Sequence, residues 1–86
     1  MERRAWVRPK VGLHARPAAD LVKAVNAGGI PVRIGRPGDP GVDARSILAV
    51  LNLGLSQHEE VVLQAEGAQA GEVLDKLVAV LEIDEE

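Results

Sequence analysis

The stretch Gly12-Leu13-His14-Ala15-Arg16-Pro17-Ala18 joins a segment with the alternation of a β-strand to a segment with the periodicity of an α-helix. Proline suits the first position of a helix, because its ring fixes φ and its missing N–H would have no intrahelical partner there. Pro17 therefore marks where the helix starts, and His14 is expected at or just before the helix N-cap.

A histidine at a helix N-terminus has two interpretations. Backbone N–H groups without partners and the positive end of the helix dipole favour a bound anion, and a neutral imidazole is a nucleophile near pH 7. A phosphoryl group on His14 would then be met by these N–H groups and by the guanidinium of Arg16. Alternatively, His14 merely caps the helix. This stretch alone leaves both interpretations open.

The composition indicates one small globular domain over residues 1–86. Of the 86 residues, 47% are hydrophobic and 27% are charged, values that are typical of a folded chain. Trp6 is the single aromatic residue, and the absence of cysteine excludes disulfides and thiolate metal sites. The N-terminus lacks the apolar segment of a signal peptide, and no apolar run is long enough to span a membrane. We therefore expect a cytoplasmic protein without membrane insertion.

The charges are divided unevenly along the chain. Residues 1–45 contain nine Lys/Arg and four Asp/Glu, whereas residues 46–86 contain one Lys and nine Asp/Glu. The basic half contains His14 and favours an anionic group or an acidic partner surface. Nucleic acid is not expected as a partner, because the net charge is −3 and stacking aromatic residues are missing. Without a heptad pattern or a long hydrophobic edge, a monomer is expected.

Seven elements are predicted from the alternation and periodicity of the apolar residues. The strands are expected at Arg3–Arg8, Ile30–Ile34, Val42–Ala44 and Glu60–Glu66, and the helices at Arg16–Ala27, Ile47–Asn52 and residues 70–82. The turn Gly35–Gly41 would join the second and third strands as a loose hairpin. This order, β-α-β-β-α-β-α, predicts an α+β sandwich whose helices cover the apolar face of four strands. Residues 84–86 are expected to form a frayed acidic tail.

The short helix at Ile47–Asn52 carries more apolar residues than one face can bury. Ser46 is expected to cap this helix, and Gly54 to stop it. Either some of the apolar side chains remain exposed as a contact surface, or the whole helix is buried beneath a loop. The excess favours a contact surface. His58, in the polar loop that follows, is expected to be an ordinary surface histidine.

Residues 12–18 resemble the active-site signature of the HPr family, the histidine-containing phosphocarrier proteins of the bacterial phosphoenolpyruvate:sugar phosphotransferase system. Residues 45–54 are similar to the family's regulatory-serine segment, and the order and length of the elements agree over essentially the whole chain. The resemblance implies an open-faced β-sandwich with a four-stranded antiparallel sheet and three helices on one side.

The resemblance also implies a phosphocarrier rather than an enzyme. His14 would accept a phosphoryl group at Nδ1 from phosphorylated enzyme I and pass it to enzyme IIA, and Arg16 matches the family's active-site arginine. Ser46 matches the serine that HPr kinase phosphorylates in many Gram-positive and related bacteria. The docking surface formed by the family's first two helices would include three apolar residues, Ile47, Leu48 and Leu51. Neither a cofactor nor a metal is expected.

The chain departs from the family pattern at three places outside the histidine motif. Arg45 stands before Ser46 where the commoner form has lysine, which bears on recognition by the kinase. The turn Gly35–Gly41 is unusually rich in glycine and proline. The docking surface lacks the methionines or phenylalanine frequent in relatives.

Two other functions fit parts of the sequence. A regulatory paralogue, nitrogen-related or controlled at Ser46, would act mainly by binding a transcription factor or metabolic enzyme, although the presence of His14 argues against control by serine alone. A small metal-dependent or hydrolytic enzyme fits less well. Two histidines and no cysteine leave little for a metal site, and Ser46 with His58 shows no identifiable triad.

Overall fold

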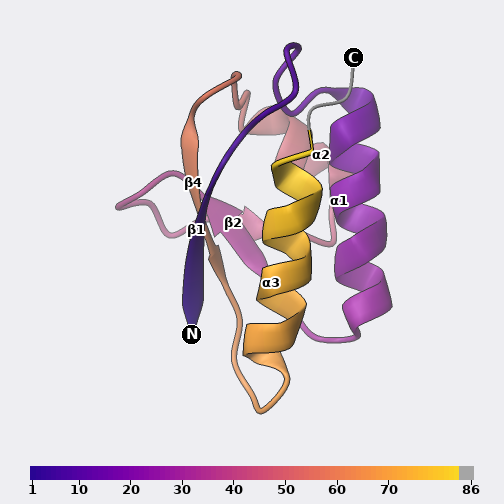
Figure 1. The fold of residues 1–86 in the computed structure, drawn as a ribbon, viewed down its shortest axis with the longest axis vertical. Helices are drawn as coiled ribbons and strands as arrows, with labels where there is room; N and C mark the ends of the chain where they lie inside the picture. The colour runs from indigo at the N-terminus through magenta and orange to yellow at the C-terminus, as the bar shows by residue number, and fades with distance from the viewer. Residues whose placement is uncertain (84–86) are drawn as a thin grey trace.

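The computed structural model describes residues 1–83, in which one four-stranded sheet is covered on one face by three helices (Figure 1). The strands are β1 (Glu2–Trp6), β2 (Arg33–Gly35), β3 (Val42–Asp43) and β4 (Glu60–Gln64), and the helices are α1 (Ala15–Gly28), α2 (Ile47–Asn52) and α3 (Ala70–Leu81). The predicted order of elements and the α+β open-faced sandwich are therefore confirmed. The predicted acidic tail, residues 84–86, lies outside the described residues.

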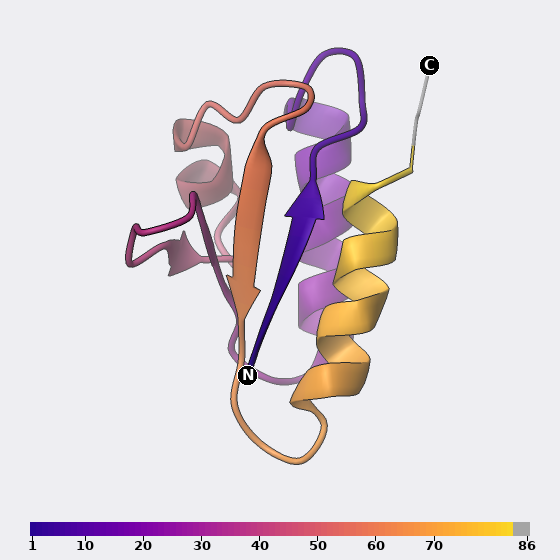
Figure 2. The same ribbon diagram turned by 60° about the vertical axis from the view of Figure 1, so that its left-hand side comes forward.

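The sheet places the first and fourth strands side by side. Its order is β1-β4-β2-β3, and every neighbouring pair is antiparallel. In the register, Arg4 lies opposite Val62, and Ile34 lies opposite both Leu63 and Val42. Figure 2 shows β1 and β4 adjacent, with α1 behind them. Since β2 and β3 form the predicted hairpin, the turn 35–41 lies at one end of the sheet.

The core lies between the sheet and the helices and consists of aliphatic side chains. Alternate residues of β1 and β4 face inward because successive side chains of a strand point to opposite faces, so Ala5, Val61 and Leu63 are fully buried. Their partners are the apolar stripes of the helices, such as Leu21 of α1 and Leu74 of α3. No polar or charged residue is buried among residues 1–83. The predicted strand and helix faces are confirmed.

Several element boundaries differ from the prediction by one to three residues. β2 begins at Arg33 rather than Ile30, because Pro31 has no N–H to donate to a ladder. β1 ends at Trp6 rather than Arg8, although Val7 still exchanges backbone hydrogen bonds with the turn before β4. β4 ends at Gln64 rather than Glu66. These differences do not change which side chains are buried.

Candidate functional site

His14 is the N-cap residue of α1, as predicted, but it does not cap the helix with its side chain. Its backbone is extended (φ −83°, ψ −171°), and its carbonyl accepts the first intrahelical hydrogen bond from the N–H of Ala18 at 2.8 Å. The imidazole is exposed and makes no capping hydrogen bond or other polar contact with residues 1–83. The interpretation of His14 as merely a capping side chain is therefore wrong, and both ring nitrogens are available for chemistry.

The backbone before His14 is fixed against the segment that follows α2. The N–H of Leu13 donates to the carbonyl oxygen of Leu55 at 2.9 Å, and both side chains are buried. Gly12 has a φ of +74°, and a Cβ at this position would lie 2.4 Å from the Leu55 oxygen. Only glycine fits such a close approach without strain. An exposed imidazole thus projects from a held backbone.

Arg16 lies in the first turn of α1 with its side chain exposed. The N–H groups of Ala15 and Arg16 meet no carbonyl acceptor within the described chain, as expected for the first turn of a helix. Because α1 begins at Ala15, Pro17 is the third helical residue. The prediction that Pro17 is the first helical residue is wrong. Its missing N–H still leaves no intrahelical bond unmade. The helix end therefore offers backbone donors and one flexible cation beside His14.

Ser46 is the N-cap of α2, as predicted. Its side-chain oxygen accepts a hydrogen bond from the N–H of Ala49 at 3.2 Å, which is a capping contact. The neighbouring Arg45 donates through Nε and Nη2 to the carboxylate of Asp43, each at 3.1 Å. This pairing, with the Arg45 backbone N–H as a further donor, holds the pKa of Asp43 below its usual range. Ser46 is exposed.

α2 keeps part of its apolar surface outside the core. Leu48 is 70% exposed and Ile47 38% exposed, whereas Val50 is fully buried and Leu51 is half-buried. The helix packs against α1 and β3, but these exposed side chains exclude the alternative of a wholly buried helix. Val11, three residues before His14, is also 70% exposed and was not predicted. Val11 lies in the loop before Gly12, outside any strand or helix, so no periodicity of apolar residues indicates whether its side chain is exposed.

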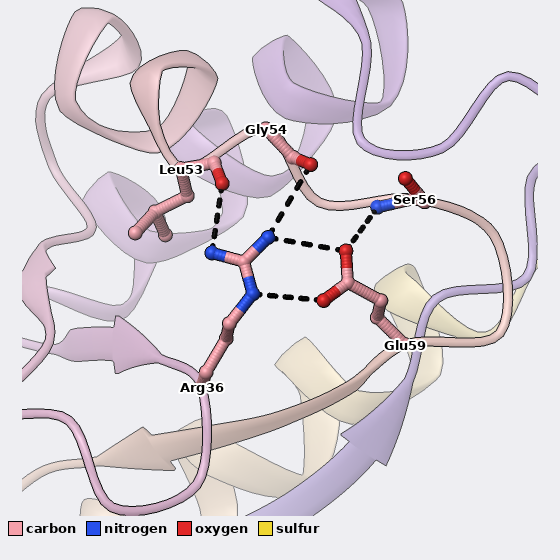
Figure 3. Close-up of polar contacts among 5 residues, drawn as sticks. All are labelled: Arg36, Leu53, Gly54, Ser56 and Glu59. Carbon is pink, nitrogen blue, oxygen red and sulfur yellow. Dashed lines mark hydrogen bonds and ion pairs between the residues drawn. The ribbon is translucent and has the colours of Figure 1, made fainter.

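A polar network that the sequence did not reveal holds the segment after α2 (Figure 3). The guanidinium of Arg36 donates to both carboxylate oxygens of Glu59, at 2.8 and 3.1 Å. It also donates to the carbonyls of Leu53, at 2.9 Å, and Gly54, at 3.4 Å. Glu59 in turn accepts from the N–H of Ser56 at 2.7 Å. We call these two side chains with their three backbone partners the Arg36–Glu59 clamp.

The clamp shifts the titration of both side chains. Hydrogen bonds from Arg36 and from the Ser56 N–H hold the pKa of Glu59 below its usual range, and the carboxylate raises the pKa of Arg36. Arg36 belongs to the glycine-rich turn and Glu59 to the polar loop, 23 residues away. In the sequence, only their opposite charges could have indicated that Arg36 and Glu59 pair. The fold brings the two side chains together.

The described chain offers little for a small-molecule or metal site. Within residues 1–83, no three His, Cys, Asp or Glu side chains are grouped so that they could hold a metal ion. A shallow hollow of about 470 Å³ lies away from His14 and is lined by Met1, Glu2, Pro31, Arg33, Gln64, Ala65 and Glu66. No helix among these residues has the length and apolar character needed to cross a membrane. The exposed site at His14 instead suits a reaction with another macromolecule.

Comparison with known proteins identifies the family. Residues 1–82 match the family model described as "PTS HPr component phosphorylation site". The chain is 52% identical over 81 residues to the phosphocarrier protein HPr of Streptomyces coelicolor, covering 91% of this chain and 87% of that protein. It is 44% identical over 86 residues to the HPr of Haloferax volcanii, covering 99% and 97%. The crystal structure of HPr from Bacillus anthracis superposes with a TM-score of 0.85 at 32% identity, covering 94% and 95%.

These matches bear out the resemblance stated from the sequence, and the family implies enzyme I and enzyme IIA proteins as partners. A shared fold alone would not fix a function, but here the match includes the phosphorylation-site model itself. The chain therefore belongs to the HPr family and is a phosphocarrier of the phosphotransferase system, which transfers a phosphoryl group without being an enzyme.

Proposed function

We propose that His14 is the residue that accepts the phosphoryl group, at Nδ1, from phosphorylated enzyme I and passes it to an enzyme IIA domain. The observation that carries this proposal is the free imidazole at the N-cap of α1, exposed on a fixed backbone and beside helix N–H groups that have no acceptor within residues 1–83. Those N–H groups and the helix dipole favour the charge that the imidazole would gain.

The transfer needs only an exposed nucleophile and charge compensation. The lone pair of Nδ1 forms the new N–P bond, while the N–P bond of the donor phosphohistidine breaks and its electron pair returns to the donor ring. The reverse exchange of bonds delivers the group to the next protein. The carrier must release the phosphoryl group that it accepts. Stabilising the phosphoryl charge at an exposed site therefore suits the transfer better than enclosing the group in a pocket.

Arg16 is proposed to stabilise the phosphoryl group during both transfers. Its exposed side chain lies in the first turn of α1 and makes no polar contact within residues 1–83, so it can move toward the phosphate without breaking another interaction. A guanidinium forms charge-assisted hydrogen bonds with phosphate oxygens, often two at a time. Arg16 would thus compensate charge without anchoring the product permanently.

The docking surface for both partners is proposed to include Ile47, Leu48 and Leu51 of α2, together with Val11. Exposed apolar side chains are typical of a protein contact surface, and α2 packs against α1, the helix that His14 begins. Because one surface must serve a donor and an acceptor in turn, modest affinity is expected. A monomeric carrier in the cytoplasm, formed by a single domain over residues 1–86, fits this role. The four strands form one sheet, and the buried residues of the described chain form one core.

Ser46 is proposed as a regulatory phosphorylation site for an HPr kinase. A phosphate on its oxygen would lie at the N-terminus of α2, where negative charge is favoured, and beside the exposed side chains of Ile47 and Leu48. The added negative charge would weaken the binding of partners that contact the apolar side chains of α2. The bidentate pairing of Arg45 with Asp43 lies directly before Ser46 and would be part of the surface that the kinase contacts.

The acceptor is tested by NMR of the phosphorylated chain. After incubation with phosphoenolpyruvate and enzyme I, we expect coupling of phosphorus to Nδ1 of His14, and no change at His58, which is also exposed. Arg16→Ala should slow transfer while the domain remains folded, and Lys23→Ala, an exposed cation later in α1, should not. Coupling at His58, or equal rates for Arg16→Ala and wild type, would contradict these assignments. No adduct under these conditions, together with an acid-stable adduct at Ser46 after incubation with ATP and a kinase, would instead favour the regulatory paralogue.

A further inference from the structure

The Arg36–Glu59 clamp fixes both ends of the four-residue segment 53–56. Arg36 holds the carbonyls of Leu53 and Gly54 at the end of α2, and Glu59 holds the N–H of Ser56. These groups have no partner in a helix or strand, because α2 ends at Asn52 and β4 begins at Glu60. The N–H groups of Leu53 and Gly54 donate to the Val50 and Leu51 carbonyls, and the Glu59 N–H donates to the Ser56 carbonyl. The clamp therefore adds side-chain hydrogen bonds to these turn contacts, at groups that no regular ladder satisfies.

The middle of this segment supports the residue before His14. Leu55, which lies between the two held ends, accepts the hydrogen bond from the N–H of Leu13 at 2.9 Å. The closeness of Gly12 to the same oxygen leaves no room for the loop to shift toward the segment. A movement of residues 53–56 would consequently move Leu13, and with it the backbone from which the imidazole projects.

We propose that Arg36 and Glu59 are positioning residues for His14, acting through Leu55 and Leu13 to set the place of the phosphoryl acceptor. This inference rests on the proposed role of His14. Neither side chain is placed in contact with the phosphoryl group. Their contribution is to keep the acceptor in one geometry before a partner arrives, since misplacement of a reacting group by about 1 Å can cost about 10²-fold in rate.

The arrangement depends on the planar guanidinium and not on the ion pair alone. Arg36 uses Nε and Nη2 on Glu59 while Nη1 and Nη2 reach the two carbonyls. A lysine ammonium could pair with Glu59 but could not span the carboxylate and both carbonyls. The side chains are about two-thirds buried, at 38% exposure for Arg36 and 32% for Glu59, so water competes for these hydrogen bonds less than it does at a fully exposed pair.

The test uses two variants that loosen the clamp but change the net charge in opposite directions. Arg36→Gln removes a positive charge, and Glu59→Gln removes a negative one. Two quantities are measured: the hydrogen exchange rate of the Leu13 amide, and the rate of phosphoryl transfer from enzyme I. Both variants should exchange the Leu13 amide faster and slow transfer by about tenfold, less than the roughly 10²-fold cost of a full 1 Å displacement.

Arg33→Gln is the matched control. Arg33 also donates from its guanidinium to two backbone carbonyls, those of Pro40 at 3.0 Å and Gly41 at 2.6 Å, but it donates no hydrogen bond to residues 53–56. It should leave both the Leu13 exchange and the transfer rate unchanged. Arg36→Lys, which keeps the charge, should still speed the Leu13 exchange. The Ala44 amide, bonded to the Val32 carbonyl at 2.8 Å, reports any general loss of stability in every variant.

The possible results separate the clamp from a general effect of charge. If transfer slows in Arg36→Gln but quickens in Glu59→Gln, the effect is electrostatic and the inference is wrong. Unchanged exchange at Leu13 in both variants would also overturn it. If the wild type accepts no phosphoryl group at His14, the proposed acceptor fails, whereas the exchange of the Leu13 amide still decides whether the clamp positions that backbone.

Discussion

The carbonyl of Leu55 accepts a hydrogen bond from the N–H of Leu13 at 2.9 Å, across 42 residues of sequence. This contact joins the segment that ends α2 to the loop that presents His14. The backbone before His14 and the segment after α2 are therefore held to each other directly.

Gly12→Ala is expected to destabilise the fold more than Gly29→Ala. Both glycines have a φ of +74°, but a Cβ at Gly12 would lie 2.4 Å from the Leu55 oxygen, whereas nothing lies within 4 Å at Gly29. The left-handed conformation alone costs about 1–2 kcal/mol for other residues, and Gly12→Ala should cost more than this. Urea unfolding of both variants measures the difference. Equal costs would show that the loop is not held against Leu55.

Ser46→Ala should lower the free energy of unfolding more than His14→Ala. Ser46 accepts a capping hydrogen bond from the N–H of Ala49, whereas the His14 side chain makes none. Loss of a capping side chain costs typically about 1 kcal/mol, so we expect that loss for Ser46→Ala and a smaller one for His14→Ala. Thermal unfolding of the two variants provides the comparison. A larger loss for His14→Ala would mean that the imidazole supports the fold after all.

Glu59 is expected to make the stability dependent on acid pH. Hydrogen bonds from Arg36 and Ser56 lower its pKa in the folded state. Its contribution is therefore complete above the unfolded pKa, about 4.3, and is lost as the pH falls through the lower folded value. The stability difference between wild type and Glu59→Gln should shrink below about pH 5.

Unfolding by urea at pH 7, 5 and 3 measures this difference. Asp43, whose pKa is also lowered, is present in both proteins, so its contribution cancels. A difference that stays constant from pH 7 to pH 3 would contradict the assigned hydrogen bonds of Glu59.

His58→Gly is expected to stabilise the protein. Among residues 1–83, His58 is the one non-glycine residue with a positive φ, at +74°. Glycine avoids the steric penalty that a side chain has in this conformation. This gain outweighs the loss of chain entropy, roughly 0.5–1 kcal/mol, that glycine adds on folding. We expect a gain of a few tenths to about 1 kcal/mol, and no gain for His58→Ala. Stabilisation by alanine as well would assign the effect to loss of the imidazole.

The sequence was sufficient for the order of the elements and for the faces that they bury. The alternation around Val61 and Leu63 and the helical spacing of Leu74 and Leu77 predict the faces that the structure buries, because burial follows directly from a period of two or 3.6 residues. The N-cap positions of His14 and Ser46 were likewise predictable, since capping preferences are local properties of the chain, although the proline preference misplaced Pro17 by two positions.

The features that the sequence did not predict depend on contacts between residues far apart in the chain. Arg36 and Glu59 each belong to a polar stretch without periodicity, and no local rule pairs them. The capping interpretation of His14 could be excluded only by seeing where its side chain points. The shortened β2 follows from Pro31, whose effect on the ladder depends on which neighbour that strand faces.

The most direct measurement is the intact mass of the chain after incubation with phosphoenolpyruvate and a bacterial enzyme I. Wild type, His14→Ala and His58→Ala are compared, with part of each sample acidified. We expect one acid-labile phosphoryl adduct in wild type and His58→Ala, and none in a folded His14→Ala. An adduct that persists in His14→Ala, or no adduct in wild type, would contradict the role proposed for His14.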